Sequence, residues 1–423
     1  TTLIIRETNR ALAALAAVGL FFATWALNDW IAYARVDLPA IALGMVGLLL
    51  ITSPRRKTGF ILGVVAFTAA FYTKQTQVIA PIAAMFAMLA VGDWRRAGVF
   101  ALVMTAVNGL IFGLLILVTG GEFWLHTVVY NANEMVPGQI KIWLAHLWNF
   151  GRFKILATVL AAAAAVWIFR LWRTQFTDED APLLNERRLT LWAVFFFTIL
   201  SGLSLATTGK AGAATNYLLE FHAATALLAG LVAGHLSWIG TRTEKKEVLP
   251  KPARPLLIGL VLLITFHAAE MSVGMPFRKK TPLPTYKYFH HPPSSNQRAL
   301  NDQVLLYLAD IDGVVLCEEP IFSLLLNRPV IYQPFIMSQL AREGKWDQNK
   351  FVMDLYRAKF PAIVASQDLL DDEAFFTGWT EEMRAGVKHS YQLFRVVGGS
   401  RGGYYIYRPK DLDLPPAPEP LVG

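Results

Sequence analysis

The sequence of 423 residues contains a single cysteine, Cys317. One cysteine excludes an intramolecular disulfide and any metal site built from several cysteines. Charged residues are also scarce, at 17%, whereas 54% of the residues are hydrophobic and the mean hydropathy is positive. Soluble chains usually carry about 25% charged residues, so this composition indicates a membrane protein.

Several common signatures are missing. The sequence has no P-loop, no His-Glu-x-x-His and no basic stripe interleaved with aromatic residues. We therefore expect no nucleic-acid partner despite the net charge of +8, and we assign no metal ligands. The chain begins Thr-Thr-Leu, with no initiator Met and no signal core, which predicts a further segment upstream.

Long hydrophobic runs dominate the first two thirds of the chain. A helix that crosses a bilayer needs about 17 to 25 mostly apolar residues. We expect a polytopic helical bundle of about nine transmembrane helices over residues 1–272, at about 10–28, 36–53, 59–73, 77–92, 98–119, 153–172, 189–208, 217–239 and 255–272.

Basic residues predict the orientation, because loops rich in Lys and Arg stay cytoplasmic. One set of alternate connections holds 16 such residues: Arg6, Arg10, Arg55, Arg56, Lys57, Arg95, Arg96, Arg170, Arg173, Arg187, Arg188, Arg242, Lys245, Lys246, Lys251 and Arg254. The other holds 6: Arg35, Lys74, Lys141, Arg152, Lys154 and Lys210. We expect a multi-pass protein of the inner (plasma) membrane, with a cytoplasmic N-terminus and an extracytoplasmic C-terminal domain.

An external segment, 121–152, is neither a short turn nor a span. Its apolar residues recur at helical spacing, at Ile140, Trp143, Leu144, Leu147 and Trp148. This pattern favours a helix in the membrane interface, with a packed loop helix as the alternative.

Beyond residue 272 the composition changes. We expect a proline-containing linker at 273–294, a small α/β domain at 295–410 and a disordered tail at 411–423. The domain is predicted to have helices at 299–309 and 349–359, a short helix after the first strand, and strands at 313–316, 329–332, 362–365, 392–397 and 404–408.

Polar residues at the external ends of the spans are the strongest candidates for a functional site, because burying them is costly unless they are paired. Three clusters share that side: Arg35 and Asp37; Lys74 and Gln75; and Lys210, Asn216, Tyr217, Glu220 and His222. The alternatives are an interfacial ion pair for Arg35 with Asp37, and a snorkelling side chain for Lys74. Cations suit a phosphate and a carboxylate can orient a hydroxyl, so the clusters point to a lipid-linked phosphate.

Three short motifs carry a family resemblance: Ala-Arg-Val-Asp-Leu-Pro at 34–39, Tyr-Thr-Lys-Gln-Thr at 72–76 and Gly-Ala-Ala-Thr-Asn-Tyr-Leu-Leu-Glu at 212–220. Together they resemble the bacterial GT-C superfamily, multi-span glycosyltransferases similar to protein mannosyltransferases and lipid A aminoarabinose transferases. The resemblance covers about residues 1–270.

The resemblance implies an enzyme that moves a sugar from a polyprenyl phosphate to an extracytoplasmic glycan, lipid or protein, with inversion. It implies a donor pocket lined by Arg35, Asp37, Lys74, Gln75, Asn216, Tyr217 and Glu220. The surrounding membrane lipid is a further expected partner, and the resemblance is compatible with a divalent metal as cofactor. The family's catalytic acid lies in a long first external loop; since 28–37 is short, we expect that acid upstream of residue 1. A lipid flippase or transporter and a non-catalytic membrane scaffold remain the alternative hypotheses.

Overall fold

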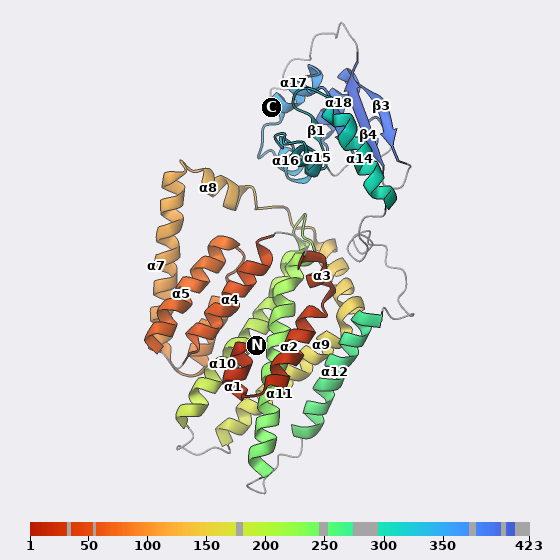
Figure 1. Ribbon diagram of the computed structural model, residues 1–423. Helices are drawn as coiled ribbons and strands as arrows, with labels where there is room; N and C mark the ends of the chain where they lie inside the picture. The colour runs from red at the N-terminus through yellow and green to blue at the C-terminus, as the bar shows by residue number, and fades with distance from the viewer. Residues whose placement is uncertain are drawn as a thin grey trace. The chain divides into compact units, whose positions relative to one another are not determined.

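The computed structural model describes residues 1–31, 35–53, 56–174, 181–244, 253–273, 295–371, 378–398 and 403–410. The chain divides into two compact units, Thr1–Pro282 and Leu283–Gly423. The first is a bundle of helices and the second combines helices with a sheet (Figure 1). The predicted tail and all but the first residue of the predicted linker lie outside the described residues.

The helical unit contains fifteen named helical segments in its described part. The N-terminal ones are α1 (Thr2–Thr8), α2 (Ala11–Phe22), α3 (Trp25–Ile31), α4 (Asp37–Ile51), α5 (Arg56–Thr73), α6 (Ile79–Ala90) and α7 (Trp94–Val118). They are followed by α8 (Glu122–Trp124), the π-helix η1 (Leu125–Val129), α9 (Pro137–Thr174), α10 (Ala181–Leu203), the 3₁₀ helices η3 (Ser204–Gly209) and η4 (Thr215–Leu218), and α11 (Leu219–Glu244). The last helix in the described part of this unit is α12 (Ala253–Val273).

Among the described residues, five helices are long and apolar enough to cross a membrane, by length and composition: Trp94–Val118, Pro137–Trp172, Arg187–Gly209, Thr215–Ile239 and Ala253–Glu270. They coincide with the last five predicted spans. The first four predicted spans fall on the shorter apolar helices α2, α4, α5 and α6. The membrane character of the chain is thus supported, and the number nine stays a prediction.

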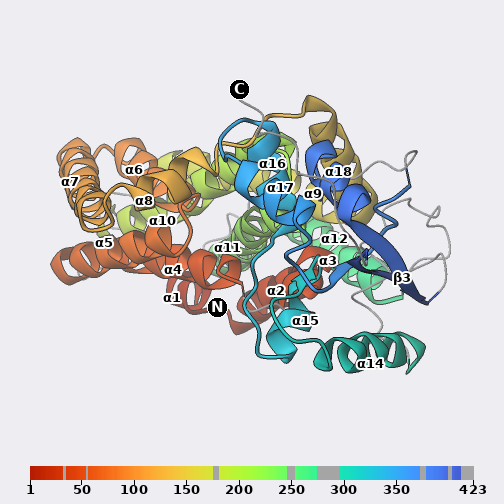
Figure 2. The ribbon, with the colours of Figure 1, turned by 90° about the horizontal axis from the view of Figure 1, so that it is seen from above.

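Helix α11 lies within the bundle and packs against α1, α2, α9, α10 and α12 (Figures 1 and 2). Small residues allow this close approach. A Cβ on Gly230 would lie 2.6 Å from Ile4 Cδ1 and 2.7 Å from Ala17 Cβ. Membrane helices commonly pack through such small residues, because van der Waals contact between them replaces the hydrophobic effect as the driving force.

The segment between α7 and α9 begins with α8 and η1, and the predicted interfacial helix forms the first half of α9. Gly151 has non-helical angles (φ −149°, ψ 20°), so α9 kinks there. Of the predicted apolar face, Leu147 is buried, whereas Leu144 and Trp148 are exposed. The helix is confirmed, and its place in a membrane interface stays a prediction.

The C-terminal unit is built on a four-stranded mixed sheet of order β1-β2-β4-β3. Its strands are β1 (Leu316–Cys317), β2 (Ile363–Ala365), β3 (Tyr391–Val397) and β4 (Tyr404–Pro409). Strand β2 pairs in parallel with β1 and antiparallel with β4. Its helices are α14 (Ser295–Ala309), α15 (Pro320–Leu325), α16 (Pro334–Arg342), α17 (Asn349–Tyr356) and α18 (Glu381–Ser390).

Both faces of this sheet are covered. Leu316, Ile363 and Tyr407 belong to one core with residues of α17 and α18. Cys317, Val364 and Ile406 belong to the other with residues of α14 and α15. Alternate residues of a strand face opposite sides, so the sheet is the middle layer of a sandwich. Burial raises the pKa of the Cys317 thiol to about 11, which makes this cysteine an inert core residue.

The predicted elements of the C-terminal unit need three corrections. Residues 329–332 form no strand in the described chain. Val330 and Ile331 are exposed, whereas the Tyr332 side chain is buried and its hydroxyl donates to the Gly378 carbonyl. The first strand lies at 316–317 rather than 313–316. Helices α16 and α18 were not predicted.

Candidate functional site

Asp37 is the first residue of α4 and is buried, with 3% of its surface exposed. Its Oδ1 accepts hydrogen bonds from Lys74 Nζ at 2.5 Å and from Asn216 Nδ2 at 2.8 Å. A carboxylate in the first turn of a helix also interacts favourably with the helix dipole. Asp37 therefore joins three segments that are far apart in the sequence.

Lys74 follows the last residue of α5, where its backbone N–H still donates to the Ala70 carbonyl. Its ammonium group forms an ion pair with Asp37 and lies 5.5 Å from the centre of the Tyr217 ring. An ammonium over an aromatic face is attracted by the ring quadrupole. The cation is thus held in one place by an acid and an aromatic ring.

Glu220 is the second residue of α11 and has 9% of its surface exposed. Its Oε1 has no hydrogen-bond partner among the described residues. A buried carboxylate without a partner is costly, so it is a candidate for binding a hydroxyl, a cation or a proton from a ligand.

A cavity of about 230 Å³ opens between these residues. Its polar lining comes from the turn after α5, from η3, from η4 and from the start of α11: Lys74, Thr76, Gln77, Ser204, Thr207, Asn216, Tyr217 and Glu220. One cation, one carboxylate, two amides and four hydroxyls can together hold an anion and several hydroxyl groups.

Five of the seven predicted donor-pocket residues come together here. The cavity is lined by Lys74, Asn216, Tyr217 and Glu220. Asp37 accepts hydrogen bonds from two of these residues, Lys74 and Asn216. The other two lie elsewhere. The Arg35 guanidinium stacks 4.5 Å from the centre of the Trp30 ring, and Gln75 Nε2 donates to the Thr127 carbonyl at 3.2 Å.

Lys210 and His222, which share the predicted clusters, do not line the cavity. The Lys210 ammonium donates to the Asn131 carbonyl, and its backbone bridges to Met135. His222 is fully buried on another side of α11.

Sequence reasoning missed the uncharged members of the lining. Gln77 is 4% exposed, and Ser204 and Thr207 belong to η3. Gln77 directly continues the polar run that begins at Thr73, so its position could have suggested it. Ser and Thr also occur commonly in membrane helices, where they bond to their own backbone, as Thr207 does to the Ser204 carbonyl.

Among the described residues, no group of three or more His, Cys, Asp or Glu side chains could hold a metal ion. The carboxylate of Asp37 bonds to Lys74 and Asn216, and that of Glu220 lines the cavity.

Comparisons of the chain with protein family models, with curated proteins and with solved structures found no match to any of them.

Proposed function

We propose that this chain is a membrane glycosyltransferase that takes a sugar from a polyprenyl-phosphate donor and passes it, with inversion, to an extracytoplasmic acceptor. The observation that carries the proposal is the junction of the polar cavity with an apolar groove. Gln77 and Val78 line both. A ligand with a phosphate and sugar at one end and a hydrocarbon chain at the other fits such a junction.

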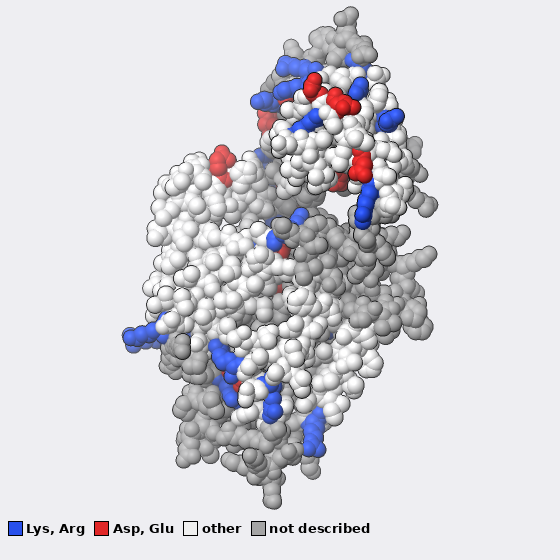
Figure 3. Space-filling view, viewed as in Figure 1, with Lys and Arg blue, Asp and Glu red and all other residues white. Residues whose placement is uncertain are grey.

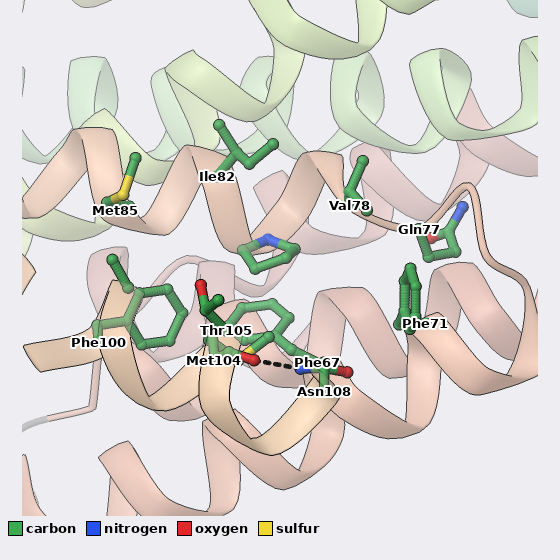
Figure 4. A pocket seen from close by; sticks show the side chains of 12 residues that line it. Phe67, Phe71, Gln77, Val78, Ile82, Met85, Phe100, Met104, Thr105 and Asn108 are labelled. Atoms are coloured by element: carbon green, nitrogen blue, oxygen red, sulfur yellow. Dashed lines mark hydrogen bonds between the residues drawn. The ribbon is translucent and has the colours of Figure 1, made fainter. Parts of the chain in front are cut away.

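The groove has a volume of about 290 Å³ and runs between α5, α6 and α7 (Figure 4). Val78, just before α6, and Ile82 and Met85 of α6 line one side, and the aromatic rings of Phe67, Phe71 and Phe100 lie across from them. In the most apolar stretch of α7 no residue is buried inside the bundle, so this side of the groove is open to lipid. An isoprenoid chain could enter from the bilayer without crossing water.

In this proposal the residues divide the work by chemistry. Lys74 pairs with the donor phosphate and stabilises the negative charge that grows on it as the bond to the anomeric carbon breaks. Asp37 acts through Lys74 by fixing its position, and Asn216 in turn holds Asp37. Glu220 Oε1, which has no hydrogen-bond partner among the described residues, accepts a hydrogen bond from a sugar hydroxyl. The base that activates the acceptor is not assigned to any of them.

The test is transfer from a radiolabelled polyprenyl-phosphate sugar by the full-length protein in detergent or vesicles. Lys74→Ala and Glu220→Ala are expected to lower transfer at least about a hundredfold, the size of effect seen when one group that stabilises transition-state charge is removed. Gln75→Ala is the matched control, because Gln75 shares the turn of Lys74 but bonds to Thr127 instead.

Equal loss in Gln75→Ala, or full turnover in both cavity variants, would remove the site assignment. The same assay separates an enzyme from a flippase, since only an enzyme releases polyprenyl phosphate from its sugar. Label that crosses the vesicle membrane still attached to its lipid would favour the flippase.

A further inference from the structure

A second pocket lies at the opposite end of α5 from Lys74. It has a volume of about 500 Å³, and its cationic lining is Lys57, Arg95 and Arg96. Lys57 is the second residue of α5 and Arg95 the second of α7. Since α5 has 18 residues and a helix rises about 1.5 Å per residue, about 27 Å separate the two sites.

The structure keeps the three cations at this pocket. Arg96 Nη2 donates to the Ile51 carbonyl at 2.5 Å, which ties the start of α7 to the end of α4. The one acid in the lining, Asp93, caps α7 by accepting from the Arg96 backbone N–H at 3.2 Å. Three positive charges therefore face one carboxylate that is already engaged, and the pocket complements an anion.

Apolar surface continues from the pocket along the two helices. Ile61 and Val99 line the pocket and are 62% and 47% exposed, and Leu102, one turn further along α7, is 70% exposed. Trp94, beside the pocket, is 69% exposed, and exposed tryptophans of membrane proteins gather at the level of the lipid headgroups. Figure 3 shows Lys and Arg gathered toward one end of the helical unit, below a broad surface without charge.

We infer that this pocket binds an anionic phospholipid of the surrounding bilayer, with its phosphodiester among Lys57, Arg95 and Arg96 and its acyl chains along α5 and α7. The charge of the pocket selects the headgroup, and the exposed apolar flank explains why the anion is a lipid and not a free ion. Basic pockets between membrane helices commonly bind such headgroups. The inference does not depend on the proposed enzymatic activity.

The first test measures lipid binding to the purified full chain in detergent by native mass spectrometry, with phosphatidylglycerol and phosphatidylcholine as probes. Phosphatidylglycerol should bind more tightly. The double variant Lys57→Ala, Arg95→Ala should weaken its binding about thirtyfold, the effect of losing two cations at a membrane surface. Arg96 is left in place because of its bond to Ile51.

The matched control is Arg170→Ala, Arg254→Ala, which removes two exposed arginines of the same predicted membrane side outside the pocket. It should leave binding unchanged. Equal weakening in both double variants, or none in the pocket variant, would overturn the inference. Displacement of the lipid by excess inorganic phosphate would also overturn it, because the pocket would then be a site for the free anion.

A second measurement uses the unmodified sequence, so it stands even if the double variant does not fold. A photoactivatable phosphatidylglycerol should crosslink to peptides that contain residues 57–61 and 93–102. Crosslinks spread evenly over the other lipid-facing helices, with no excess on these two peptides, would contradict a specific site.

Discussion

At the scale of single residues, the contact of Asp37 with Lys74 is the centre of the candidate site. The sequence identified both residues, because charges at the ends of apolar runs are conspicuous. It could not show that they bond to each other, because 36 residues and a helical hairpin separate them. An ion pair of Asp37 with Arg35, two residues away, was an equally good interpretation of the sequence. Arg35 instead stacks on Trp30.

Removing either member of this pair should expose the dependence of the other on it. Lys74 and Asp37 side chains are 19% and 5% exposed, and breaking a largely buried pair leaves an uncompensated charge. We expect Asp37→Ala and Lys74→Ala each to lower the free energy of unfolding. The sum of these two losses should exceed the loss in the double variant by a coupling energy of about 1 to 3 kcal/mol. Thermal or denaturant unfolding in detergent measures it.

The control cycle pairs Asp37→Ala with Gln75→Ala, whose side chains make separate hydrogen bonds. Its coupling should be close to zero. A coupling near zero in the Asp37 and Lys74 cycle as well would show that the contact contributes nothing to stability.

At the scale of elements, hydrophobic patterning located the long helices and the strands β2, β3 and β4, and it missed helices α16 and α18. The last five predicted spans coincide with long apolar helices because an apolar run of that length has few alternatives. In the C-terminal unit, 329–332 reads as a strand but finds no partner strand. Helix α18 begins after an N-cap residue, Thr380, whose hydroxyl accepts from the Met383 backbone N–H. The helix was missed because its polar composition gives little hydrophobic periodicity.

The packing of α11 against α1 and α2 gives a prediction of its own. In Gly230→Ala the new Cβ would lie 2.7 Å from Ala17 Cβ and 3.0 Å from the Ala13 carbonyl oxygen, neither of which can move without its helix. We expect a loss of about 1 to 3 kcal/mol in the free energy of unfolding, the usual cost of overpacking. The midpoint of thermal unfolding in detergent should fall accordingly.

Gly109→Ala in α7 is the control, because a Cβ there meets nothing within 4 Å. Alanine favours a helix over glycine by up to about 1 kcal/mol, so this variant should be neutral or slightly stabilised. Similar behaviour of the two variants would mean that α11 does not approach α1 and α2 as closely as the structure places it.

At the scale of the whole molecule, the two units have separate cores. Every member of the two C-terminal cores lies between Leu300 and Tyr407, and every member of the two helical cores lies before Ile264 or at it. Composition predicts a helical domain over 1–272 and an α/β domain over 295–410, because charge returns where the apolar runs end. The pairing of β2 with both β1 and β4 could not be predicted in the same way, since it depends on contacts across 40 or more residues.

Separate cores predict that residues 283–423 fold without the helical unit. Expressed alone, this segment should unfold cooperatively on heating and show both helix and strand by circular dichroism. Val364→Asp should abolish that transition, because Val364 is 1% exposed in the middle layer of the sandwich and an unpaired carboxylate there is costly. Asp312→Ala, at an exposed position, should keep it. A segment without cooperative unfolding, in a buffer where the full chain is folded, would show that the sheet needs the helical unit to form.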